Sequence, residues 1–87
     1  MSISDADKVK ALREICNVGV IEAKQAILYC QDHPEANEVG YVMAKGAAVY
    51  MRCTPEERIE RFSQGAKSHS CYKRWEKFLE TGIVPKE

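Results

Sequence analysis

The sequence predicts an all-α fold, and three observations support this expectation. Apolar residues recur at spacings of three and four along most of the chain, as they do on one face of a helix. Capping residues, prolines and glycines separate these segments from one another. No stretch alternates apolar and polar residues for long enough to indicate a strand. We therefore expect five helices and no sheet.

The first helix is expected to begin just after Ser4, which can cap the free N–H groups. Asp5 and Asp7 place negative charge at the positive end of the helix dipole. Its apolar stripe consists of Val9, Leu12, Ile15 and Cys16. We expect it to end around residues 16–17, with Gly19 supplying the tight turn into the next helix.

Two further helices complete the first half. The second begins near Val20 and ends before a break at residues 31–34. Pro34 and Glu35 suit the first turn of the third, which is expected to end at residues 45–46. Gly40 inside this third helix would mark a close approach of another helix. The two apolar stripes are Val20, Ala23, Ala26, Ile27 and Cys30, and then Ala36, Val39, Val42 and Met43.

After a connector at residues 47–53, Thr54-Pro55-Glu56-Glu57 is the clearest start signal in the chain. It combines a capping residue, a proline at the first helical position and two acids. This fourth helix is expected to end at residues 63–65, and a fifth to begin near Ser68 or Ser70 and close at residues 81–82. Their apolar faces contain Ile59 and Phe62, and then Tyr72, Trp75, Phe78 and Leu79.

Composition narrows the class of protein. A chain of 87 residues supports one small domain, with or without an appendage, and a large catalytic cleft is not expected. Thirteen basic residues balance thirteen acidic ones, so net charge gives no general attraction to nucleic acid or membranes. No apolar run approaches the roughly 20 residues of a membrane span, and the polar start is unlike a signal peptide. We expect a cytoplasmic protein with reduced cysteines.

The segment from Val9 to Ile27 carries an ungapped motif. It reads Val-Lys-x-Leu-Arg, then a glycine-containing loop, two apolar residues, an acid, and finally Lys with an Ala-Ile pair. The positions concerned are Val9, Lys10, Leu12, Arg13, Glu14, Gly19, Glu22, Lys24, Ala26 and Ile27. This motif resembles the N-terminal UBA/TS-N module of bacterial elongation factor Ts, in which Asp and Leu are usual where this chain has Glu22 and Ile27. With a third helix ending in Lys-Gly, the resemblance extends over roughly residues 5–49.

The resemblance implies a UBA-like three-helix bundle over residues 1–49. Residues 50–87 would then form a two-helix extension, either packed on the bundle or forming a surface for a partner. In the family, the partner is the GTPase elongation factor Tu, bound through positions that correspond to Arg13, Val20 and Ile21. Val and Ile replace the family's paired methionines, which adapt better to irregular surfaces. The Thr-Asp-Phe-Val motif of the family's exchange domain does not occur here, so nucleotide exchange is not expected.

The UBA branch of this fold binds ubiquitin, typically through a Met-Gly-Phe/Tyr loop and a leucine-rich end of the third helix. The corresponding segments here are Val18-Gly19-Val20 and Met43-Ala44-Lys45, which match poorly. Ubiquitin is therefore not expected to be the partner.

Two other constellations have structural explanations. Four cysteines and two histidines suggest zinc, but the cysteines are 14, 23 and 18 positions apart, whereas structural zinc ligands come in close pairs. No metal or cofactor is expected. The second constellation is the set of basic residues around Tyr72 and Trp75, which could bind nucleic acid: Lys67, Lys73, Arg74 and Lys77. The shared helical spacing of the aromatics instead favours a core face.

The function expected from the sequence is non-enzymatic binding of another protein. The protein would be a small accessory or regulatory protein of a bacterium or phage, either a monomer or a homodimer. The expected contact residues are Arg13, Val18, Gly19, Val20, Ile21 and Met43. Two alternatives remain: a nucleic-acid-binding protein using the basic fifth helix, and a mimic of the elongation factor Ts module that binds elongation factor Tu.

Overall fold

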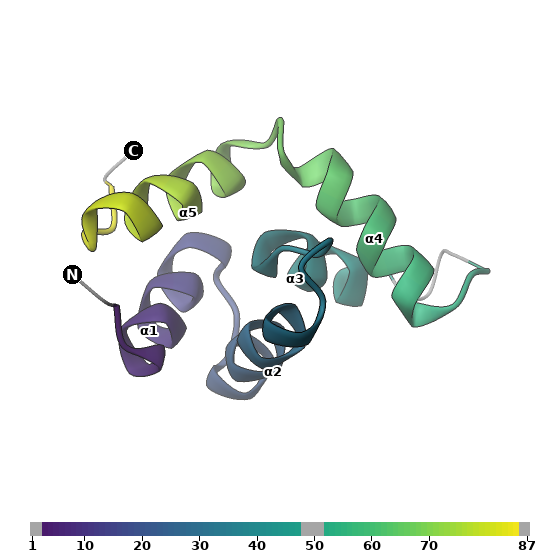
Figure 1. Cartoon of the computed structure of the whole chain (residues 1–87), viewed down its shortest axis with the longest axis horizontal. Coiled ribbons are helices and arrows are strands. Elements are labelled where there is room, and N and C mark those ends of the chain that lie inside the picture. Colours follow the sequence, from purple (N-terminus) through teal and green to yellow (C-terminus); the bar gives the residue numbers. More distant parts are fainter. Residues whose placement is uncertain (1–2, 48–51, 86–87) are drawn as a thin grey trace.

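The structure is a computed structural model that describes residues 3–47 and 52–85. It confirms the all-α prediction, because these residues form five helices and no strand (Figure 1). The connector expected at residues 47–53 lies largely outside the described residues. The helices are α1 (Asp5–Cys16), α2 (Val20–Asp32), α3 (Glu38–Gly46), α4 (Pro55–Ala66) and α5 (Ser70–Thr81).

The turn between α1 and α2 differs from the prediction. Ser4 caps α1 as expected, since its hydroxyl accepts a hydrogen bond from the Asp7 N–H at 3.2 Å. The left-handed residue that ends α1 is Asn17, with φ of 56°, and not Gly19. Gly19 has an extended backbone with φ of −77° and ψ of 168°. Asparagine tolerates the left-handed region better than most residues, so the turn does not need the glycine.

The start of α3 was also predicted too early. Pro34 and Ala36 precede the helix, and Asn37 is its N-cap. The Asn37 Oδ1 accepts a hydrogen bond from the Gly40 N–H at 2.7 Å. A side-chain acceptor satisfies one of the free N–H groups of a new helix, which a proline ring cannot do.

The predicted boundaries of α4 and α5 are close to those observed. The Thr54 hydroxyl caps α4 by accepting from the Glu57 N–H at 3.2 Å, and α4 continues one residue past the expected end, to Ala66. His69 caps α5 through Nδ1, which lies 3.1 Å from the Cys71 N. Gly82, with φ of 77°, ends α5 as predicted.

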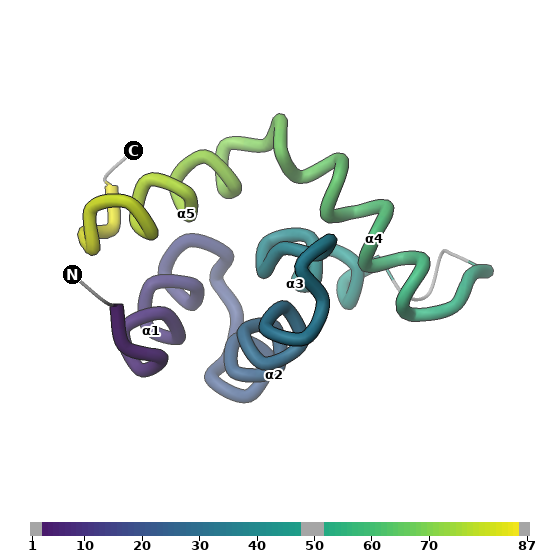
Figure 2. The backbone as a smooth tube through the Cα atoms, viewed as in Figure 1, coloured from purple at the N-terminus to yellow at the C-terminus, as the bar shows by residue number. Residues whose placement is uncertain are grey.

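The last two helices form an arch over the first three. In Figures 1 and 2, α4 runs beside α3 and α5 crosses above α1, so the start of α1 and the end of α5 lie near each other. One hydrophobic core joins all five helices, and Leu12, Val39 and Trp75 are its largest fully buried apolar side chains. The apolar face predicted for α5 is buried at Trp75 and Phe78, but Leu79 is exposed.

Helices α3 and α4 are in very close contact at Gly40. Among the glycines of the described residues, Gly40 is the one where an added Cβ would meet another helix. A Cβ atom on Gly40 would overlap the backbone of Ser63, and it would lie 2.6 Å from the Ser63 N. This is the close approach expected at Gly40. Two hydrogen bonds join the same helices: Asn37 N–H donates to the Ser63 hydroxyl at 3.0 Å, and Asn37 Nδ2 donates to the Ser63 carbonyl at 2.8 Å.

Two polar side chains also link α4 and α5 to α3 by hydrogen bonds. The Trp75 Nε1 donates to the Glu38 carboxylate at 2.9 Å, which connects α5 to the first turn of α3. Arg58, which is buried in α4, donates through Nε to the Ala44 carbonyl at 3.1 Å. Arg58 lies four residues before Phe62, on the apolar face of α4, but this contact was not predicted.

Candidate functional site

A shallow hollow lies where the start of α2 meets the end of α3. Its volume is about 520 Å³. We call its lining the Gly19 surface: Gly19, Val20, Ile21, Glu22, Gln25 and Lys45. The first five residues belong to one stretch of chain, and Lys45 comes from the last turn of α3.

The apolar part of this surface is exposed because of the helical period of α2. The buried stripe of α2 is Ala23, Ala26 and Ile27, which places Ile21 on the opposite side of the helix. The exposed fraction of Ile21 is 74%, and that of Val20 is 40%. Val20 was predicted both as the first residue of the apolar stripe of α2 and as a contact residue, and its side chain is exposed.

The structure separates the six predicted contact residues into three groups. Gly19, Val20 and Ile21 line the hollow together. Arg13 is exposed in the last turn of α1 but does not line the hollow. Val18 and Met43 are half-buried and pack against the core, and they do not line the hollow.

Lys45 was not predicted as a contact residue. Its Nζ lies 5.3 Å from the centroid of the Tyr41 ring, a cation–π arrangement that holds the ammonium beside the end of α3. The sequence did contain a signal, since Lys45 is the only basic residue in α3. Together with Glu22 and Gln25, it gives the exposed isoleucine a polar rim.

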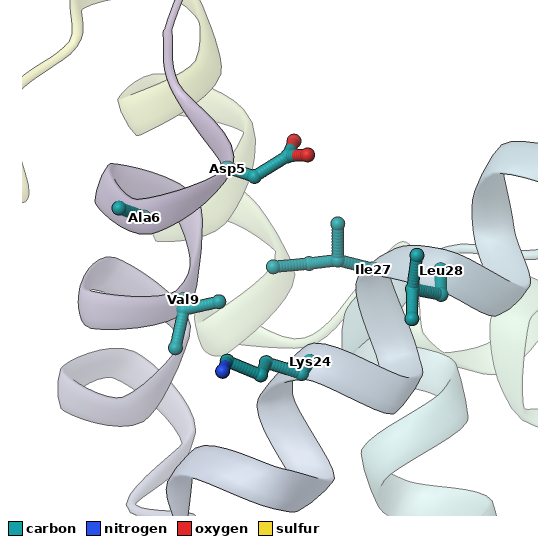
Figure 3. Close-up of a pocket in the computed structure, with 6 residues that line it drawn as sticks. All are labelled: Asp5, Ala6, Val9, Lys24, Ile27 and Leu28. Atoms are coloured by element: carbon teal, nitrogen blue, oxygen red, sulfur yellow. The ribbon is translucent and has the colours of Figure 1, made fainter.

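A second hollow lies between α1 and α2, and it has a volume of about 430 Å³ (Figure 3). We call it the α1/α2 groove, and it is lined by Asp5, Ala6, Val9, Lys24, Ile27 and Leu28. Ile27 points from α2 towards α1 across its floor, whereas Asp5 and Lys24 stand at its two ends. Leu28 at its edge is 60% exposed. This groove was not predicted from the sequence.

The basic residues of the nucleic-acid alternative do not share one environment. Lys67, Lys73 and Lys77 are exposed, whereas Arg74 is half-buried and donates through Nη2 to the Pro85 carbonyl at 3.2 Å. Trp75, which could have stacked on a base, is 1% exposed. It is therefore part of the core.

The cysteine thiols are half-buried and are not joined in disulfides. Burial, helped by the neighbouring Cys71, raises the pKa of Cys16 from 9.0 to about 11. Burial and the Glu38 carboxylate also raise the pKa of Cys30. Within residues 3–47 and 52–85, no group of three His, Cys, Asp or Glu side chains could hold a metal ion.

Comparison with known proteins adds no relative. No protein-family model, no curated protein and no solved structure matches this chain. Among the described helices, none combines the length and the apolar character needed to cross a membrane.

Proposed function

We propose that this chain is a non-enzymatic protein-interaction module with a UBA/TS-N-like arrangement of α1, α2 and α3. Its binding site would be the Gly19 surface. The observation that carries the proposal is the exposure of Ile21, which at 74% is the most exposed large apolar side chain in the described chain. An exposed aliphatic residue beside a hollow loses contact with water when a partner covers it.

The chemistry of the surface fits a small hot spot. Fully burying an isoleucine side chain contributes about 1.5–3 kcal/mol, which is enough to anchor a moderate interaction. Glu22, Gln25 and Lys45 surround it with groups that can hydrogen-bond to a partner. An apolar centre with a polar rim is the usual composition of a protein interface.

Elongation factor Tu is the first partner to test, because the sequence resemblance assigns Val20 and Ile21 to contacts with that GTPase. Both side chains are exposed here, and so is Arg13. A small protein that occupied the same position on the GTPase without an exchange domain would act as a competitor of elongation factor Ts.

The experiment is affinity capture from a lysate of the native host, followed by calorimetry with the purified partner and with purified elongation factor Tu. The test variant is Ile21→Asp, and the matched control is Leu79→Asp, an exposed apolar residue on α5. We expect a specific protein to be captured by the wild type and the control but to bind Ile21→Asp at least about tenfold more weakly. Capture that ignores the Ile21 substitution would refute the proposal.

A further inference from the structure

The α1/α2 groove has apolar walls and opposite charges at its two ends. Asp5 stands beside the C-terminal half of α2, and Lys24 stands one turn before Leu28 (Figure 3). Both charged side chains are exposed. The occupant that fits such a groove carries an apolar side chain between a basic group, which would meet Asp5, and an acidic group, which would meet Lys24.

The outer face of α2 itself has this pattern. Lys24, Leu28 and Asp32 are spaced four residues apart, and all three are exposed, so they lie on one face of the helix in the order base, aliphatic, acid. Asp32 is in the last turn of α2, which contains no basic residue. A carboxylate at that negative end of the helix dipole is unfavourable unless a cation lies near it.

If two copies of α2 lie antiparallel, each of these charged and apolar side chains meets a complementary one. Leu28 of each copy then enters the α1/α2 groove of the other. Lys24 of one copy approaches Asp5 and Asp32 of its partner, and the partner's Lys24 does the same in return. A two-fold axis produces this self-complementary contact, because every residue of the patch meets the patch of an identical chain.

We propose that the α1/α2 groove binds α2 of a second copy of this chain and forms a two-fold symmetric dimer. The interface involves different side chains from the Gly19 surface, so it goes beyond the proposed binding function. Only a few side chains of each copy take part, so we expect a weak, reversible association. The dimer would carry two Gly19 surfaces and could hold two partner molecules.

The test is sedimentation equilibrium of the full chain at concentrations up to about 1 mM, a range in which weak association is detected. We expect a monomer–dimer equilibrium that weakens with added salt. Leu28→Asp should weaken dimerisation by more than about a hundredfold, because the two-fold axis doubles the loss of one buried leucine. The control Leu79→Asp should leave it unchanged.

A mixing experiment separates this geometry from any other association. Lys24→Glu alone makes the contact acidic on both sides, and Asp5→Lys/Asp32→Lys makes it basic on both sides. Each variant should be monomeric by itself, whereas an equimolar mixture should form a heterodimer. Circular dichroism of each variant checks that α1 tolerates the loss of Asp5 from its first turn. A wild type that stays monomeric at about 1 mM, a dimer that survives Leu28→Asp, or a mixture of folded variants that fails to associate would each overturn the proposal.

Discussion

Replacing Gly40 with alanine should force α3 and α4 apart. The new Cβ would lie 2.5 Å from the Ser63 Oγ and 2.6 Å from the Ser63 N, and it would overlap the Ser63 Cα. Cβ atoms in proteins essentially never approach other heavy atoms closer than 3.0 Å. Because two of these three atoms belong to the backbone of α4, a change of side-chain rotamer cannot remove the overlap.

Three contributions set the size of the effect. Alanine favours helix over glycine by about 1 kcal/mol, which stabilises α3. Overpacking in a well-packed contact costs about 1–3 kcal/mol. Separation of the helices also stretches the two hydrogen bonds between Asn37 and Ser63, each of which contributes about 0.5–1.5 kcal/mol. We therefore expect the free energy of unfolding to fall by about 3 kcal/mol.

The measurement is urea denaturation followed by circular dichroism at 222 nm. The matched control is Gly65→Ala in α4, where an added Cβ meets nothing within 4 Å. That control should leave stability unchanged or raise it by up to about 1 kcal/mol. If Gly40→Ala is as stable as the wild type while the control behaves as expected, then the close packing of α3 on α4 is not as described.

Two further predictions concern the hydrogen bond between Trp75 and Glu38 and the raised pKa of Cys16. Trp75→Phe should destabilise the fold by about 2–3 kcal/mol, because it leaves the Glu38 carboxylate without its donor and removes buried volume. In a double-mutant cycle with Glu38→Ala, which removes the acceptor, purely additive losses would contradict a direct interaction. The raised pKa of Cys16 means that the folded state keeps a proton that the unfolded state releases above about pH 9, so stability should be full below that pH and fall towards pH 11. Cys16→Ala should reduce this fall in the urea midpoint between about pH 8 and pH 10.5, and an unchanged fall would argue against a raised pKa of the Cys16 thiol.

Several helix boundaries could be predicted from interactions between residues close together in the sequence. Ser4 and Thr54 cap α1 and α4 as predicted, and Gly82 ends α5 in the left-handed conformation that glycine favours. The two boundaries that were wrong both involve asparagine. Asn17 and Asn37 perform a turn and a cap that had been assigned to a neighbouring glycine and proline. Several residues can serve at such positions, and the choice among them depends on how the flanking helices pack.

The candidate site also has one part that could be predicted from the sequence and another that depends on helix packing. The sequence predicts contact residues at and just after Gly19, and Val20 and Ile21 are exposed at the start of α2. It could not show that Lys45 joins them, or that Arg13 does not line the hollow, because these facts depend on how α1, α2 and α3 pack together.

The order of polar and apolar residues was by itself enough to determine the helical class and most of the helix ends, since both arise from interactions within a few residues. The partner of each apolar face was decided only by the tertiary structure. Leu79 and Trp75 occupy the same predicted face of α5, yet one is exposed and the other is almost completely buried. The difference arises because α5 crosses α1 and α3 with only part of that face, and burial depends on this crossing and not on hydrophobicity alone.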